Sequence, residues 1–293
     1  PEHRNITDQL YGGDVHVRIR QELVLGIGGL RALKAMGLKP TVYHLNEGHS
    51  AFLQVERVRD LMAEENLTFD EALEAIRANS VFTTHTSVPA GIDVFDPGLL
   101  YEYFGEYCRQ SGIDFDRLLD LGRMNGSHHA NKFLMPVLAM QTASYRNGVS
   151  QLHQVVSQEM WQSLWPNLPD HEVPILGITN GIHLMSWLNG DLGNLYDQYL
   201  QPDWRDRISD PETWKAVQDI PDHEISEIQR RRKLRLIHFV RQRMMESARR
   251  RNLSAGEVTR AGEVLDTNAF TIGLARGLAT YTGATLIVSD KGR

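Results

Sequence analysis

Two imidazoles, an amide and a carboxylate lie within six residues of this 293-residue chain, in the stretch His-Leu-Asn-Glu-Gly-His from His44 to His49. A metal site, a charged turn and one wall of a substrate pocket would each use these residue types. The preceding residues 41–43, Thr-Val-Tyr, are typical of a β-strand, and an apolar-periodic segment follows the stretch. The chemistry depends on which of these side chains face the same point.

A zinc site is the first alternative. Protein zinc sites use His, Cys and acidic ligands at short recurring spacings, such as His-Glu-x-x-His on a helix or paired cysteines. Neither pattern occurs, and the other close histidines, His128 and His129, are adjacent. His44 lies inside the expected strand, so it need not face the same point as His49. The sequence therefore disfavours a metal site.

Polar residues follow three expected strands. Polar residues 46–49 follow the expected strand 41–45, residues 85–87 follow the strand 80–84, and residues 179–181 follow the strand 173–178. In open α/β sheets, ligands bind beyond the carboxyl ends of the strands. Each cluster alone is typical of turn chemistry. Three in one sheet favour a pocket of neutral hydrogen-bonding groups, suited to a polyhydroxylated ligand.

The remaining pattern predicts the elements that would position these clusters. Strands alternate with helices, one beginning near Ser50 and another at the capping-box sequence 68–71, and the chain up to about Trp165 is mostly helical after the second strand. A later helix opens at Asp210-Pro211, and residues 269–274 and 284–289 are expected strands. We therefore expect an α/β fold with a largely parallel sheet, divided into residues 1–185 and 186–293.

Composition restricts the class of protein. The chain is 41% hydrophobic and 23% charged and has one cysteine, Cys108, which favours a buried structural thiol in a cytoplasmic protein. Residues 230–251 hold ten Lys/Arg and one acid, but apolar residues recur at helical spacing, at Leu234, Ile237, Val240, Met244 and Ala248. That pattern favours a solvated helix with one buried stripe over nucleic-acid binding. The chain begins with Pro1 and stops just after an expected strand, so we expect an internal fragment.

Glycines at positions 26, 28 and 29 raise a nucleotide-binding alternative. A dinucleotide fingerprint needs its glycines directly after a strand. Here Gln21-Glu22-Leu23 precedes them, and Leu30 and Leu33 follow at helical spacing. Close helix packing is the favoured interpretation, and nucleotide-dependent transfer or oxidoreduction stays as a third hypothesis.

Seven segments in order along the chain resemble one family. They are YGGD at 11–14, QELVLGIGGLRAL at 21–33, HLNEGHSAF at 44–52, FTTHTSVPAG at 82–91, NGVSQLH at 147–153, ITNGIHLMSWL at 178–188 and FTIGLARGLATY at 270–281. The sequence resembles the α-glucan (glycogen, starch and maltodextrin) phosphorylases, especially the shorter bacterial and archaeal type.

The resemblance implies two Rossmann-like lobes of the GT-B glycosyltransferase type. Residues 1–185 would be the later part of the N-terminal lobe, and 186–293 the crossover helices and the start of the C-terminal lobe. The implied reaction is retaining cleavage of α-1,4-glucan by inorganic phosphate to glucose 1-phosphate, with pyridoxal 5'-phosphate as cofactor. The lysine that holds this cofactor belongs to a later segment, so the isolated chain is expected to be inactive. A homodimer is expected by analogy with the family.

The resemblance also implies a role for individual residues of this chain. His85 matches the catalytic histidine beside the glucosyl unit, and the expected substrate-binding residues are Glu47, His49, Asn180 and Arg276. The family usually has a second arginine and a lysine that hold phosphate, where this chain has Gly277 and Thr282. Because phosphate binding needs cationic donors, their loss supports an alternative: a catalytically inactive homologue that binds glucan.

Overall fold

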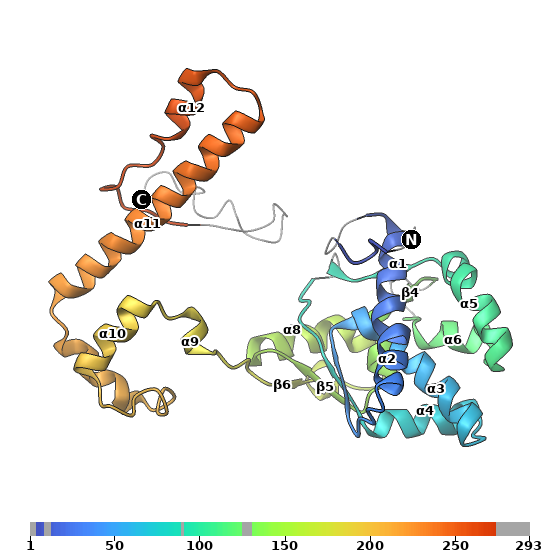
Figure 1. Ribbon diagram of the computed structural model, residues 1–293. Helices are drawn as coiled ribbons and strands as arrows, with labels where there is room; N and C mark the ends of the chain where they lie inside the picture. Colours follow the sequence, from blue (N-terminus) through green and yellow to red (C-terminus); the bar gives the residue numbers. More distant parts are fainter. Residues whose placement is uncertain (1–3, 9–12, 89–90, 125–130, 274–293) are drawn as a thin grey trace. The chain divides into compact units, whose positions relative to one another are not determined.

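The structure is a computed structural model that describes the chain apart from residues 1–3, 9–12, 89–90, 125–130 and 274–293 (Figure 1). It divides into two compact units, Pro1–Asn180 and Gly181–Arg293. The sequence-based boundary at 185/186 lies five residues further along. We describe each unit by itself.

The first unit is built on a four-stranded parallel sheet in the order β1-β2-β5-β6. The strands are β1 (Tyr43–Asn46), β2 (Ser80–Thr83), β5 (Tyr145–Gly148) and β6 (Leu176–Gly177). Parallel neighbours need crossover connections, which helices supply. Here α3 (Phe52–Glu64) and α4 (Phe69–Ala78) connect β1 to β2, and α8 (Gln151–Trp161) lies between β5 and β6. The predicted α/β class with a parallel sheet is confirmed.

Local sequence explains the crossover helices. Thr68 and Glu71 form the predicted capping box at the start of α4, each side chain bonding the other's backbone N–H. The predicted apolar face of α3 is also present, because Phe52, Val55 and Val58 are at most 4% exposed. These side chains pack with Leu45 and Phe82 from the sheet into the main core.

Strand β5 is a correction, because it lies in the stretch up to about Trp165 that the sequence predicted to be mostly helical. Its sequence, Tyr-Arg-Asn-Gly, is short and lacks the alternation of a typical strand. It forms because β2 and β6 pair with it on either side. Helices α5 (Pro97–Ser111), α6 (Phe115–Leu121) and α7 (Met135–Gln141) precede it, with a two-stranded antiparallel sheet of β3 (Val94–Phe95) and β4 (Phe133–Leu134). Cys108 is buried in α5, and burial raises the pKa of its thiol to about 11.

The glycines at 26, 28 and 29 lie inside one continuous helical stretch. It consists of α1 (Val15–Leu23), a π-helical turn (Val24–Gly28) and α2 (Gly29–Ala35). A Cβ on Gly26 would lie 2.7 Å from the backbone nitrogen of Leu53, whereas a Cβ on Gly29 would meet nothing within 4 Å. Gly26 therefore permits close helix packing. Residues 15–35 are helical throughout and contain no strand-to-helix turn of the kind that binds phosphate.

Alanine substitutions at these two glycines should have opposite effects. Gly26→Ala forces the helix away from the backbone of residues 50–53, and we expect a loss of about 3 kcal/mol in the free energy of unfolding. Gly29→Ala removes backbone entropy without a clash and should gain about 0.5–1 kcal/mol. Urea unfolding of both variants measures the difference. Equal effects would contradict the packing role of Gly26.

The second unit is helical over its described residues. It contains α9 (Leu184–Trp187), α10 (Gly190–Tyr199), a 3-10 helix (Pro211–Asp219), α11 (Asp222–Arg250) and α12 (Ala255–Ala261). A small core joins Leu195, Ile220 and Ile228. Within the basic helix α11, Ile237 and Ala248 are buried as expected, but Met244 is 43% exposed, so the predicted buried stripe is incomplete.

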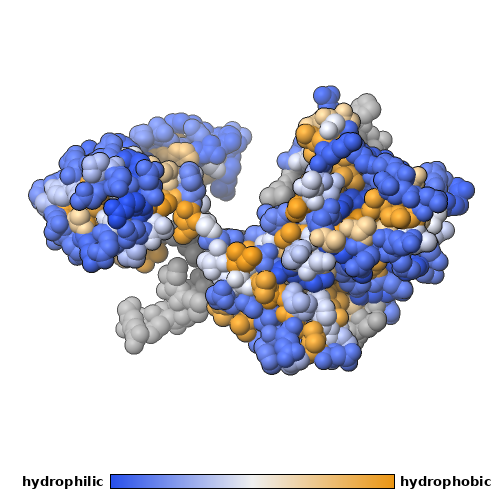
Figure 2. Space-filling view, turned by 90° about the horizontal axis from the view of Figure 1, so that it is seen from below, coloured by the Kyte–Doolittle hydropathy of each residue, from blue (hydrophilic) through white to orange (hydrophobic). Residues whose placement is uncertain are grey.

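The strand expected at 269–274 is wrong over its described residues, 269–273, which have no regular structure. Phe270 is 91% exposed, and no described strand lies beside it to complete its hydrogen bonds. The strand expected at 284–289 lies outside the described residues. Among the described helices, none has the length and apolarity needed to cross a bilayer. Figure 2 shows a face of mostly hydrophilic residues interspersed with smaller hydrophobic patches.

Candidate active site at the carboxyl edge of the parallel sheet

The polar clusters meet at one edge of the sheet. Backbone bonds continue past the strands: the Glu47 N–H donates to the Thr83 carbonyl at 2.8 Å, and the Thr84 N–H donates to the Asn147 carbonyl at 2.9 Å. Beyond β6, the Asn180 N–H donates to the Val149 carbonyl at 3.1 Å. The three clusters follow β1, β2 and β6 of one parallel sheet, as expected, and β5 lies between the second and the third.

Glu47 lies just after β1 in an unusual backbone conformation. Its φ of 67° is rare for a residue with a side chain and costs on the order of 1–3 kcal/mol unless surrounding contacts hold it. Its Oε2 accepts hydrogen bonds from the backbone N–H groups of His85 (2.8 Å) and Thr86 (2.9 Å) and from the Thr86 hydroxyl (3.0 Å). Glu47 is 8% exposed, and its Oε1 is buried without a hydrogen-bond partner within the described part of the chain.

His85 follows β2 with its side chain exposed. Its backbone is fixed by Glu47, and the next residue is also held from the other side, where His153 Nε2 lies 3.3 Å from the Thr86 carbonyl oxygen. The Val149 N–H donates to His153 Nδ1 at 3.1 Å, which leaves Nε2 as the protonated ring nitrogen. An exposed imidazole therefore projects from a firmly held backbone.

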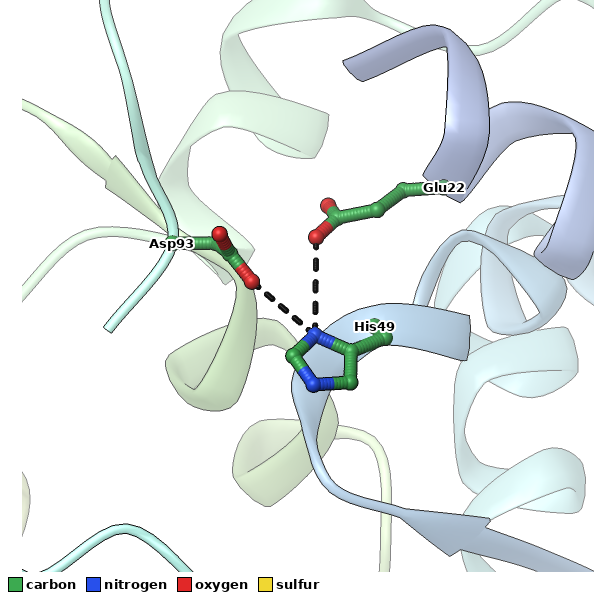
Figure 3. A group of neighbouring side chains, drawn as sticks. All are labelled: Glu22, His49 and Asp93. Atoms are coloured by element: carbon green, nitrogen blue, oxygen red, sulfur yellow. Dashed lines mark hydrogen bonds and ion pairs between the residues drawn. The ribbon is translucent and has the colours of Figure 1, made fainter. Parts of the chain in front are cut away.

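His49 joins a charged cluster that connects distant parts of the first unit. Glu22 from α1 and Asp93 from the segment before β3 both point at its Nδ1, at 3.7 and 2.9 Å (Figure 3). Arg18, one turn before Glu22, binds Asp93 with two nitrogens, at 2.9 and 2.8 Å. We call Arg18, Glu22, His49 and Asp93 the charge cluster.

The three potential metal ligands of this cluster, Glu22, His49 and Asp93, have donor atoms within 4.8 Å of one another. One guanidinium nitrogen of Arg18 lies 2.6 Å from His49 Nδ1, 2.8 Å from Asp93 Oδ2 and 3.1 Å from Glu22 Oε1. A permanently charged group thus occupies the point that a metal ion would take. The described contacts make this cluster an ion-pair network centred on Arg18.

Burial and hydrogen bonding set the protonation of the charge cluster. Burial raises the pKa of Glu22 to about 8. Hydrogen bonds to Asp93 and then Glu22 raise the pKa of His49 to about 9. Burial alone would raise the pKa of Asp93, but hydrogen bonds from His49 and Arg18 hold it well below its usual range. At neutral pH Glu22 and His49 therefore both hold a proton, while Asp93 is ionised.

We expect the free energy of unfolding to fall as pH rises from 6.5 to 9. His49 has a folded pKa of about 9 against an ordinary 6.5, so its contribution is complete below 6.5 and lost by about 9. The folded pKa of Glu22 is about 8 against an ordinary 4.5, so its contribution to the free energy of unfolding also falls as pH rises from 4.5 to 8. Urea unfolding at pH 6.5 and 9 should show a loss on the order of 1–3 kcal/mol.

Two variants isolate this effect. Glu22→Gln should flatten the pH dependence, because a neutral amide replaces the buried titrating acid. Glu64→Gln, at an exposed acid paired with Lys34, should leave the slope unchanged. A wild-type stability that is constant or rises over this range would contradict the assignment.

The other expected site residues lie along the same edge or outside the described chain. Asn180 is exposed beside the end of β5, and Arg276 is outside the described residues, as are Gly277 and Thr282. His44 Nε2 lies 2.7 Å from the Thr83 hydroxyl, away from the charge cluster, as the strand pattern indicated.

Four residues of the site were not predicted from the sequence: Arg18, Glu22, Asp93 and His153. Glu22 and Asp93 are 27 and 44 residues from His49, and no spacing rule connects them. His153 gave one usable signal, since it stands three residues after Ser150, whose hydroxyl accepts from the His153 N–H and caps α8.

Comparison with known proteins decides the family. The model of the carbohydrate phosphorylase family matches residues 31–263, most of the chain. The chain belongs to the carbohydrate phosphorylase family. This confirms the resemblance found in the sequence motifs.

Curated relatives cover the whole chain. It is 41% identical over 290 residues to the maltodextrin phosphorylase of Thermococcus litoralis, 35% over 301 residues to the glycogen phosphorylase of Mycobacterium tuberculosis (strain H37Rv), and 32% over 290 residues to that of Aquifex aeolicus. Each match includes 99% of this chain and 33%, 34% and 41% of the respective relative. The chain thus spans about a third to two fifths of the length of these relatives.

Proposed function

We propose that the protein containing this chain is an α-glucan phosphorylase, which cleaves α-1,4-glucan or maltooligosaccharide with inorganic phosphate and releases glucose 1-phosphate with retained configuration. The observation that carries the proposal is the exposed His85 imidazole, held at the carboxyl edge of a parallel sheet in a member of this family. Two Rossmann-like lobes of the GT-B type are part of the proposal, with 1–185 in the first lobe and 186–293 leading into the second.

The site residues suit recognition of a sugar. His85 would donate a hydrogen bond to the glucosyl unit at the cleaved bond, and Asn180 would bind the same sugar. Glu47 and His49 would line the pocket. A developing oxocarbenium ion is stabilised when hydroxyl contacts strengthen in the transition state, and a neutral donor such as the Asn180 amide fits this chemistry. Arg276 would contribute a cation to the substrate site.

Pyridoxal 5'-phosphate is the proposed cofactor of the complete protein, where it would supply a phosphate group for proton transfer. The described residues do not fit its covalent attachment, because no described lysine is buried. Lys34 is paired with Asp60 and Glu64, and Lys132 with Asp96. We therefore assign no step of the reaction to a lysine of this chain.

A second candidate function is glucan binding without turnover. The observation that favours it is the presence of Gly277 and Thr282 at the positions where the family motif has its phosphate-holding arginine and lysine. Such a protein would keep the sugar pocket at the sheet edge and lack the cations that phosphate requires.

The test uses the complete gene product. Its intact mass and pyridoxal content are measured first, and then the release of glucose 1-phosphate from maltoheptaose with and without inorganic phosphate. Phosphate-dependent release is the expected result. Retained binding of maltoheptaose with no release would replace the proposal with the second candidate, and the absence of both would overturn each of them.

A further inference from the structure

We propose that Glu47 and His153 are positioning residues that hold the His85-Thr86 segment from opposite sides and so direct the His85 side chain. This inference rests on the proposed function, and it gives Glu47 a different task from direct sugar binding. Glu47 follows β1 and His153 lies in the first turn of α8, so the segment after β2 is held by both neighbouring parts of the sheet edge.

The hydrogen bonds of Glu47 hold the backbone of this segment in place. A single carboxylate oxygen accepts from three donors, two of them the successive backbone N–H groups of His85 and Thr86. Hydrogen bonds to an ionised acceptor are stronger than those between neutral groups. All the described hydrogen bonds of this carboxylate go through Oε2 to the His85-Thr86 segment, while Oε1 is buried without a partner among the described residues.

The backbone around Glu47 fixes the direction of its carboxylate. Its own N–H is bonded to the Thr83 carbonyl, and its positive φ turns the chain sharply after β1. The following residue, Gly48, is pressed against α7, since a Cβ there would lie 2.8 Å from the Pro136 backbone nitrogen. The turn therefore cannot relax without moving α7.

His153 holds the next peptide group, through the Thr86 carbonyl. Its Nε2–H faces the Thr86 carbonyl while Nδ1 accepts from Val149, so both ring nitrogens have backbone partners. His153 is 8% exposed, and its ring lies close over the end of β5, where a Cβ on Gly148 would be 2.9 Å from Nδ1. Thr86 thus has its N–H fixed by Glu47 and its carbonyl fixed by His153.

Hydrogen exchange of the complete gene product tests this arrangement directly. We expect the amides of His85 and Thr86 to exchange at least about tenfold faster in Glu47→Ala than in wild type, because their acceptor is lost. Glu47→Gln, which keeps one acceptor oxygen and the side-chain shape, should fall between the two. His153→Asn provides an independent variant on the opposite side and should also loosen the segment.

The matched control is Glu56→Gln. Glu56 in α3 is also a buried acid, and it accepts hydrogen bonds from Arg31 and Tyr107 rather than from the His85 segment. It should leave the exchange of His85 and Thr86 unchanged even if global stability falls. Unchanged exchange in both Glu47 variants and in His153→Asn would overturn the inference.

Kinetics distinguish positioning from sugar binding. With phosphorolysis of maltoheptaose as readout, a positioning role predicts a fall in kcat of about tenfold or more in Glu47→Gln with KM for glucan changed less than threefold. A direct sugar contact would raise KM and leave amide exchange as in wild type, which contradicts the inference. Wild-type protein without phosphorolysis would overturn the proposed function instead, and the exchange measurement would still decide whether Glu47 and His153 hold the segment.

Discussion

His85→Ala should lower kcat for glucan phosphorolysis by at least about a hundredfold in the complete protein, with a smaller change in KM. Removing one donor that acts mainly in the transition state costs two to three orders of magnitude in comparable sites. The structure provides the conditions for such an effect, since the His85 side chain is exposed while its backbone is held by a buried carboxylate. Initial rates of glucose 1-phosphate release measure the loss.

His171→Ala is the control for this variant. The His171 side chain is 81% exposed in a 3-10 turn before β6, away from the carboxyl ends of the strands. It should keep wild-type kcat and KM. A His85→Ala protein with a wild-type amide exchange pattern and undiminished kcat would show that the sheet edge is not the catalytic site.

The sheet edge could be predicted from sequence because its signals are local. A polar cluster directly after an apolar strand is visible in the sequence, and parallel pairing then requires the clusters to share one edge. The same holds for the start of α4, where Thr68 and Glu71 are three residues apart. Strand β5 escaped detection because its four residues have little intrinsic strand preference and depend on their neighbours.

The charge cluster and the hydrogen bonds that hold the His85-Thr86 segment could not be predicted, because both depend on tertiary packing. Arg18 and Glu22 meet His49 only through the packing of the first helical stretch on residues 50–53, which Gly26 permits. Likewise, the sequence placed Glu47 in the pocket wall by resemblance, and only the folded backbone reveals its bonds to His85 and Thr86. Chemistry-bearing residues were recognisable by type, while their partners were not.

Restoring the two cations of the family motif should have the second large effect. In the double variant Gly277→Arg with Thr282→Lys, each new cation can form a charge-assisted hydrogen bond with phosphate, about 1.5–3 kcal/mol apiece. If both act on the bound phosphate, kcat/KM for phosphate should rise by about a hundredfold or more. Both positions lie outside the described residues, so this expectation comes from the sequence motif alone.

The control for added charge is Gln201→Arg with Gln218→Lys, at two exposed positions of the second unit that belong to none of the matched motifs. It should leave kcat/KM for phosphate unchanged, because screened surface charges contribute little to a local site. A rise confined to the Gly277/Thr282 variant would mean that the sugar pocket is intact and that phosphate recognition is what this sequence lacks. No rise, with maltoheptaose still bound, would mean that other substitutions also separate this protein from a working phosphorylase, and glucan binding would become its better description.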